Sequence, residues 1–232
     1  NYGVASLSSR GTLMDDRIKP EIVTNGYATF STNQNNTYGN NWGTSMATPV
    51  VTGATALLQE RYRQLHGNAN AKAALLKSIM CNTAEDFGNA GPDYTYGFGM
   101  LNARKAMEAM EANQYFTNAM VTSQNDPYNI VVPAGARRLK VLLNWADYPA
   151  AANAAITLVN DLDLTVTEPS SLVHLPLILN PALVNNNAVE GIDHINNIEQ
   201  VVIDNPVAGT YQINVDGFAI PQGAQTYFLT YQ

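Results

Sequence analysis

The sequence of 232 residues has little of several things that particular classes of protein need. It contains a single cysteine, Cys81, so no disulfide can form within the chain. Charged residues make up 13% of it, against roughly a quarter in an average globular protein. Its 12 Lys and Arg are outnumbered by 19 Asp and Glu, and a short basic pair such as Arg137-Arg138 does not make the clustered positive surface that binds nucleic acid. We therefore exclude nucleic acid as a partner.

A membrane-spanning segment is missing as well. No stretch approaches the roughly 18 to 20 apolar residues that cross a bilayer, and no basic segment followed by an apolar run opens the chain. The 46% of hydrophobic residues predicts a packed core of one large or two ordinary domains. Low charge with many asparagines favours a protein that is secreted or held at the cell surface. Cys81, beside Ile79 and Met80, is predicted to be a buried small hydrophobe rather than a reactive thiol.

A helix with a serine at its start organises the first half. Residues 43–49 read Gly-Thr-Ser-Met-Ala-Thr-Pro, and they lead into a stretch from Val50 to Leu65 with one apolar stripe at helical spacing. Pro49 is expected in the first turn, where its missing N–H costs little. Ser45 fits an ordinary serine at a helix start. The same position also stabilises negative charge that develops beside its hydroxyl, as acyl transfer requires.

Three motifs, which follow one another along the chain in the family's order, resemble the subtilisin-like serine proteases, the subtilases. Residues 43–49 resemble the catalytic-serine motif of that family. Residues 8–11 (Ser-Ser-Arg-Gly) and 16–23 (Asp-Arg-Ile-Lys-Pro-Glu-Ile-Val) are similar to the run ahead of it, and residues 96–103 (Tyr-Gly-Phe-Gly-Met-Leu-Asn-Ala) to the turn that opens the last helix of the catalytic domain. The resemblance implies that Ser45 is the acyl-forming nucleophile and that its backbone N–H faces the oxyanion. The implied motif neighbours are Gly43, Thr44, Met46 and Pro49.

The resemblance also places a catalytic aspartate and then a histidine ahead of the serine, but no histidine precedes Ser45 here. His66 follows about 20 residues later, roughly 30 Å along a helix, while His174 and His194 lie in the second half. We expect structural or surface roles for all three histidines. The chain, which begins at Asn1, is therefore expected to be a fragment of a secreted serine endopeptidase that is inactive alone. Its expected partners are polypeptide substrates and the missing N-terminal part of the catalytic domain.

The pattern of apolar and polar residues changes near Asn113. Before it we predict strands at Gly3–Ser8 and Pro20–Thr24, a surface loop at Asn33–Asn41, and two further helices, one capped by Asn70 and one from Leu101 to Ala112. After it, short alternating runs separated by Pro and Gly predict strands: Tyr128–Val132, Arg138–Trp145, Asp161–Thr167, Ile198–Ile203, Gly209–Val215 and Thr226–Tyr231. The predicted fold class is α/β over residues 1–112, a partial subtilase-like parallel sheet with helices, followed by an all-β jelly-roll-like sandwich over residues 113–232.

Four motifs of the second half resemble the jelly-roll sandwich that is appended to some subtilases and related to the P-domain of proprotein convertases. They are residues 143–147 (Leu-Asn-Trp-Ala-Asp), 158–164 (Leu-Val-Asn-Asp-Leu-Asp-Leu), 196–199 (Asn-Asn-Ile-Glu) and 206–211 (Pro-Val-Ala-Gly-Thr-Tyr). Such domains bind calcium, and the resemblance implies it here without an organic cofactor.

The residues themselves allow a calcium site. Asp161 and Asp163 alternate with leucines, so both carboxylates are predicted on one strand face. Asp147 and Asn160 are the further oxygen ligands that we expect for calcium. A solvated acidic strand face explains the same pattern equally well.

Two other functions compete with the protease. One is a non-enzymatic surface or adhesion module with a relic protease segment, but a relic has no need to keep the complete motif around Ser45. The other is an α/β-hydrolase esterase, which we exclude because residues 43–47 lack the second glycine of a nucleophile elbow.

Overall fold

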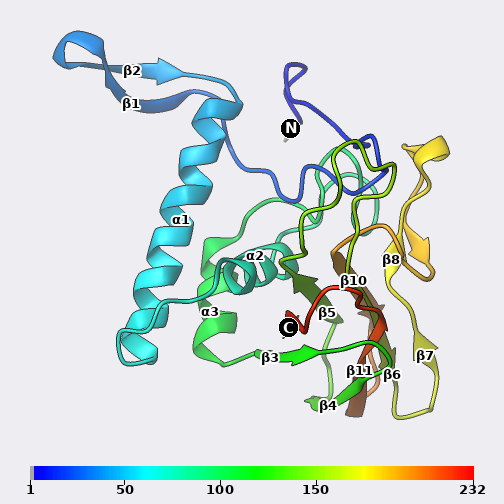
Figure 1. The fold of residues 1–232 in the computed structure, drawn as a ribbon. Helices are drawn as coiled ribbons and strands as arrows, with labels where there is room; N and C mark the ends of the chain where they lie inside the picture. Colours follow the sequence, from blue (N-terminus) through cyan, green and yellow to red (C-terminus); the bar gives the residue numbers. More distant parts are fainter. Residues whose placement is uncertain (1–2) are drawn as a thin grey trace.

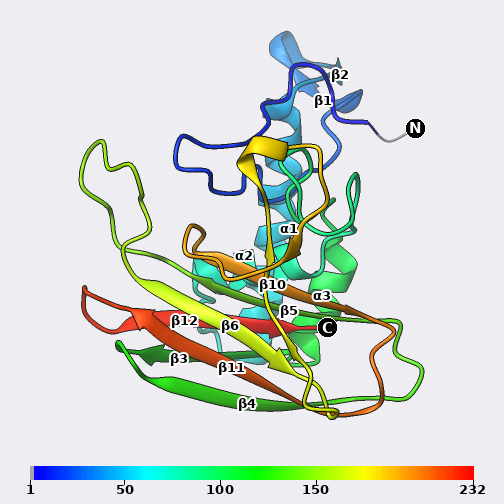
Figure 2. The ribbon, with the colours of Figure 1, turned by 90° about the vertical axis from the view of Figure 1, so that its right-hand side faces the viewer.

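The computed structural model describes residues 3–232 and places three α-helices beside an antiparallel β region, an arrangement that Figures 1 and 2 show. We call residues 3–114 the helical part. It holds β1 (Thr29–Asn33), η1 (Gln34–Asn36), β2 (Thr37–Asn41), α1 (Thr44–Leu65), α2 (Ala73–Asn82) and α3 (Ala103–Glu111). We call residues 115–232 the sandwich. It holds β3 (Tyr115–Met120), β4 (Asn125–Val132), β5 (Arg138–Trp145), β6 (Asp161–Thr167), β7 (Val173–His174), β8 (Leu177–Ile178), η2 (Pro181–Leu183), β9 (Val189–Glu190), β10 (Ile198–Asp204), β11 (Gly209–Ala219) and β12 (Gln225–Tyr231).

The three predicted helices are present, but α2 begins after Lys72 without a side-chain cap, so the predicted cap at Asn70 is wrong: its side chain accepts from Gln59 instead. α1 begins at Thr44, so Pro49 lies inside the helix rather than in its first turn and cannot donate to the carbonyl four residues before it. α3 begins after Asn102, whose side chain accepts a hydrogen bond from the Lys105 N–H at 2.9 Å. None of the helices in residues 3–232 combines the length and the apolar character needed to cross a membrane.

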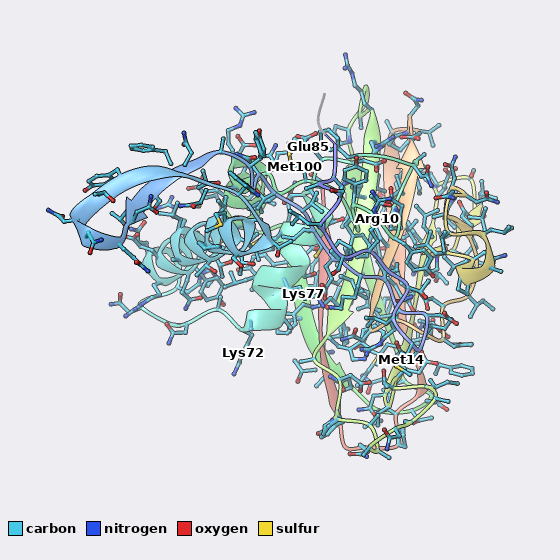
Figure 3. All side chains as sticks on the ribbon, turned by 90° about the horizontal axis from the view of Figure 1, so that it is seen from above. Arg10, Met14, Lys72, Lys77, Glu85 and Met100 are labelled. Atoms are coloured by element: carbon cyan, nitrogen blue, oxygen red, sulfur yellow. The ribbon has the colours of Figure 1, made fainter. Side chains whose placement is uncertain are left out.

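The predicted parallel sheet is not found within residues 3–232, which corrects the α/β part of the expected fold class. Residues 3–8 contain no strand, and in Pro20–Thr24 the ladder is reduced to one isolated parallel bridge between Val23 and Met100. In Figure 3, Met100 lies next to Glu85, its partner in a second, antiparallel bridge. A parallel sheet requires ladders of several paired residues between neighbouring strands. In residues 3–24, turns interrupt the chain, and only Val23 pairs with another residue in this way.

The segment Asn33–Asn41, predicted as a loop, is half of a hairpin instead. β1 and β2 pair antiparallel from Thr29 opposite Asn41 to Asn33 opposite Thr37. The hairpin projects beyond the start of α1 (Figure 1). Phe30 and Tyr38 stack across it with ring centroids 6.0 Å apart, which stabilises a ladder that the asparagines alone do not predict.

The β region is a sandwich of two antiparallel sheets, as predicted. One has the strand order β10-β5-β12-β3 and the other β4-β11-β6-β7. Side chains that alternate along these strands fill the space between the sheets, and the largest fully buried ones are Trp145, Tyr211 and Tyr227. β5 and β6 have the predicted bounds, whereas the edge strand β3 was missed because its sequence, Tyr-Phe-Thr-Asn-Ala-Met, shows no alternation.

The helical part packs on the outer face of the sheet that contains β5 and β12. Phe228 of β12 joins the core made by Leu58, Leu76 and Met110, and Leu142 of β5 joins a second small core with Cys81. The thiol of Cys81 is buried, as predicted, and burial raises its pKa to about 12. The two parts therefore share buried surface.

Polar bonds reinforce this junction. The Lys140 ammonium donates to the carbonyls of Asn82 and Ala84 at 3.1 and 2.9 Å, and the Asn144 amide donates to the carbonyl of Ala74 at 2.9 Å. Burial lowers the pKa of Lys140 to about 8, with Asp86 opposing the shift. Side chains of β5 thus bond to carbonyls at both ends of α2, and at its C-terminal end they supply donors that the helix itself lacks.

Candidate active site and candidate metal site

Ser45 is the second residue of α1, and its side chain is exposed. The helix start is held by Gly43, whose φ of 138° favours glycine and whose carbonyl accepts from the N–H groups of Met46 and Ala47. Gly43 in turn donates to the carbonyl of Gly26 at 2.8 Å. No side chain caps this end and no acidic residue lies in the first turn, so the positive end of the helix dipole remains available beside the hydroxyl.

A hollow of about 410 Å³ opens beside this helix start. Gly43, Thr44 and Ala47 line one side of it, and the segments 3–8, 23–27 and 96–100 contribute to the others. Its lining contains no Asp, Glu, Lys, Arg or His. Trp42, at 67% exposure, stands at its edge. The hollow beside the start of α1 is therefore uncharged within the described residues, and Ser45 lies next to its lining residue Thr44.

Each of the three histidines has partners elsewhere. His66 ends α1, where Nδ1 lies 2.9 Å from the Tyr62 carbonyl and Nε2 lies 2.9 Å from the Tyr115 hydroxyl. His174 lies between Glu190 at 2.9 Å and Glu168 at 3.1 Å. Burial lowers the pKa of His174, but the hydrogen bonds to both glutamates outweigh it and raise the pKa overall. His194 contacts two aspartates of the sandwich.

These features place an exposed serine at an uncapped helix start, beside a hollow whose described lining holds no acid or base. Residues 1–99 match the sequence model described as the Subtilase family, and this segment of the chain belongs to the subtilases, the serine peptidases that its motifs indicated. The helix start of α1 lies within the matched residues.

Individual relatives agree with this assignment. The chain is 23% identical over 305 residues to "Serine protease/ABC transporter B family protein tagD" of Dictyostelium discoideum, an alignment that covers 97% of this chain and 17% of that protein. It is 33% identical over 107 residues to an extracellular serine protease of Serratia marcescens, an alignment that covers 46% of this chain and 9% of that protein. It is 30% identical over 127 residues to the PII-type proteinase of Lactococcus lactis subsp. cremoris, an alignment that covers 47% of this chain and 7% of that protein. The chain spans less than a fifth of the length of these relatives.

The predicted carboxylate pair lies on β6 as expected. Leu162 and Leu164 point into the core between the sheets, and Asp161 and Asp163 occupy the opposite face. His194, on the loop between β9 and β10, joins them: its Nδ1 lies 2.8 Å from Asp161 Oδ2 and 3.6 Å from Asp163 Oδ1. The sequence predicted a structural or surface role for His194, because a loop pattern does not indicate contact with a strand 31 positions earlier.

The other two predicted metal ligands are bonded to other groups. The Asp147 carboxylate accepts from the backbone N–H groups of Tyr148, Val159 and Asn160. The side chain of Asn160 is buried, donates to the Gln222 carbonyl and to Gln225, and accepts from the Gln222 N–H. Both residues thus brace loops at the ends of β5 and β6. Calcium binding stays a prediction.

Burial perturbs the acids around this site. It raises the pKa of Asp161 to about 6, with His194 opposing the shift and Asp163 adding to it. It also raises the pKa values of Asp163 and Asp193. Glu199 of β10 is fully buried, and burial together with the charges of Asp193 and Asp163 raises its pKa well above the ordinary value.

Proposed function

We propose that this chain carries the nucleophile of a serine endopeptidase that works outside the cell or at its surface. Ser45 Oγ would attack a peptide carbonyl once a base removes its proton, and the oxyanion would lie near the Ser45 N–H and the positive end of α1. The acyl-enzyme that forms would then be hydrolysed by water. The observation that carries this proposal is the exposed Ser45 at an uncapped helix start inside the subtilase segment.

The general base and its orienting carboxylate are proposed to come from a further segment of the same protease. All three histidines of the chain have structural partners away from Ser45. α1 has a bare face on which Val50 is 40% and Leu57 is 58% exposed, and the uncharged hollow is open beside it. Apolar surface of this kind suits a covering layer of the same domain. The covering segment would bring Asp, His and an oxyanion-hole side chain to Ser45.

Residues 113–232 are proposed to be an appended domain of the jelly-roll or P-domain type, with residues 1–112 as the C-terminal portion of the catalytic domain. Two four-stranded antiparallel sheets and the order of the four sequence motifs support this proposal. In this arrangement the sandwich packs against the protease part through α2, while Ser45 lies on a part of α1 that the sandwich does not cover.

The coding sequence upstream of Asn1 tests the function directly: it is expected to supply an aspartate and then a histidine in subtilase contexts. The extended protein should hydrolyse casein, and Ser45→Ala should abolish the activity. The matched control is Ser31→Ala, which removes an exposed hydroxyl from β1 and should leave turnover unchanged. An extended protein that keeps its activity after Ser45→Ala would disprove the assignment of the nucleophile.

A further inference from the structure

The cluster of Asp161, Asp163 and His194 has the geometry of a metal site. One ligand atom from each residue lies within 4.8 Å of the other two. Two ligands at about 2 Å from a tetrahedral ion are separated by roughly 3.3 Å, and the His194 Nδ1 lies 2.8 and 3.6 Å from the two aspartate oxygens. The two distances from His194 Nδ1 therefore lie within about 0.5 Å of the separation that such an ion requires.

The oxygens around the cluster have fewer hydrogen-bond donors than they need. Asp161 is 8% exposed, and its Oδ1 is buried without a hydrogen-bond partner among the described residues. The Oδ1 of Asp163 is also buried without such a bond. Glu199, 1% exposed, accepts from the Leu164 N–H through Oε2 and leaves Oε1 without a partner. Buried carboxylate oxygens without partners are costly, and they need an explanation such as a bound ion.

The charges also point to a cation. Asp161, Asp193 and Glu199 are buried carboxylates, and Asp163 is partly buried. Within the described residues, His194 is the one ion-pair partner of the two strand aspartates, and its side chain is 41% exposed. One partly exposed imidazole therefore serves both strand carboxylates, and a divalent ion would add positive charge between them.

We propose that Asp161, Asp163 and His194 bind a divalent transition metal ion of the zinc type. The imidazole nitrogen decides between metals, because calcium takes six to eight oxygen ligands and zinc takes nitrogen together with carboxylate oxygen. The two further oxygens that calcium would require, from Asp147 and Asn160, are committed to backbone and amide groups. The donor set thus disagrees with the calcium that the resemblance implied.

The surrounding structure positions the imidazole ring. Phe218 stacks on His194 with ring centroids 4.2 Å apart. Phe218 lies at the irregularity between Gly217 and Ala219, where β11 shifts its register against β6, and such a bulge re-aims a side chain. β6 pairs with β11 along one edge but with β7 only at Val166 and Thr167. The ion would therefore connect the loop that carries His194 to β6. It would lie near the part of the β6 edge that does not pair with β7.

The test is a titration of the 232-residue chain with zinc chloride and, separately, with calcium chloride by calorimetry. We expect one zinc ion per chain, a melting temperature that rises with zinc, and no competition from calcium. Cobalt chloride provides a second readout, because its visible spectrum reports nitrogen ligation. His194→Ala should weaken zinc binding by more than about tenfold, since even outer-shell partners of a metal commonly contribute that much.

The matched control is His174→Ala. His174 also lies between two carboxylates, but Glu190 and Glu168 contact opposite nitrogens of its ring, so they cannot converge on one ion; zinc binding should be unchanged. Asp163→Asn, a nearly isosteric change at a half-buried position, should weaken zinc binding even if His194→Ala perturbs folding. Absence of zinc binding, zinc binding that survives His194→Ala, or calcium binding that displaces zinc would each overturn the proposal.

Discussion

The helical part and the sandwich bury their apolar residues in different ways. The sandwich encloses a core between its own two sheets, and Trp145, Tyr211 and Tyr227 are at most 1% exposed within it. α1 has 22 residues but buries only Ala54 and Leu58. The cores of the helical part are completed by Phe228, Leu142 and Ile198 from the outer face of a sandwich sheet.

This difference shows which part depends on the other. A sheet with a second sheet packed against it can satisfy its inner face by itself, whereas a single layer of helices cannot enclose a core. The helical part therefore relies on the sandwich on one side and leaves Ser45, Val50 and Leu57 uncovered on the other. Substitutions in the two parts should differ in cost accordingly.

The largest effect is expected in the sandwich core. Trp145→Ala removes a fully buried side chain and the hydrogen bond from its Nε1 to the Asn160 carbonyl at 2.9 Å. We expect the free energy of unfolding to fall by about 3 to 5 kcal/mol, because the cavity and the lost transfer energy add. Urea unfolding followed by fluorescence and circular dichroism measures it. A loss below about 1 kcal/mol would mean that the sandwich core is looser than described.

The next effect concerns the junction and depends on pH. Lys140 has a pKa of about 8 in the folded chain and about 10.4 when unfolded. Between these values the unfolded chain holds more protons, so this group makes stability rise as pH increases from 8 to 10.5, by up to about 3 kcal/mol. Other groups also titrate in this range, so the quantity to measure is the difference between the native chain and Lys140→Met in urea unfolding at several pH values. Parallel curves for the two proteins would contradict the perturbed lysine.

A smaller effect is expected at the start of α3. Asn102→Ala removes the side-chain acceptor of the Lys105 N–H, which typically costs about 1 kcal/mol. Asn102→Ser keeps a cap acceptor without placing a second carboxylate beside Glu85 and serves as the control, with stability close to native. If both variants are equally destabilised, the contact of the Asn102 amide with Glu85 at 2.7 Å, rather than the cap, is the interaction that matters.

The smallest effect is expected on the bare face of α1. Leu57→Ala changes a side chain that is 58% exposed, and surface substitutions away from special features usually stay within about 0.5 kcal/mol. Leu58→Ala, one position along and 1% exposed, is the matched contrast and should cost about 2 to 5 kcal/mol. Equal costs for the two would show that this face of α1 is covered in solution, by a second copy of the chain or by another segment.

Local patterns determined much of this protein. Small residues followed by an apolar stripe predicted α1 around Ser45, and alternating leucines and aspartates predicted β6 with its two carboxylates on one face. These features depend on neighbours within a few positions, so periodicity and turn chemistry are sufficient to find them. The family resemblance on residues 1–99 rests on equally short motifs.

Contacts between distant residues were decided by the tertiary structure alone. The hairpin of β1 and β2 depends on the Phe30 and Tyr38 rings meeting across it, and the predicted strands near residues 3–24 lack neighbours to pair with. Packing of β10 and its preceding loop against β6 brings His194 to Asp161, while Asp147 and Asn160 form hydrogen bonds with other groups. Residue types specify which bonds a side chain can make, but only the assembled fold determines which partners lie within reach.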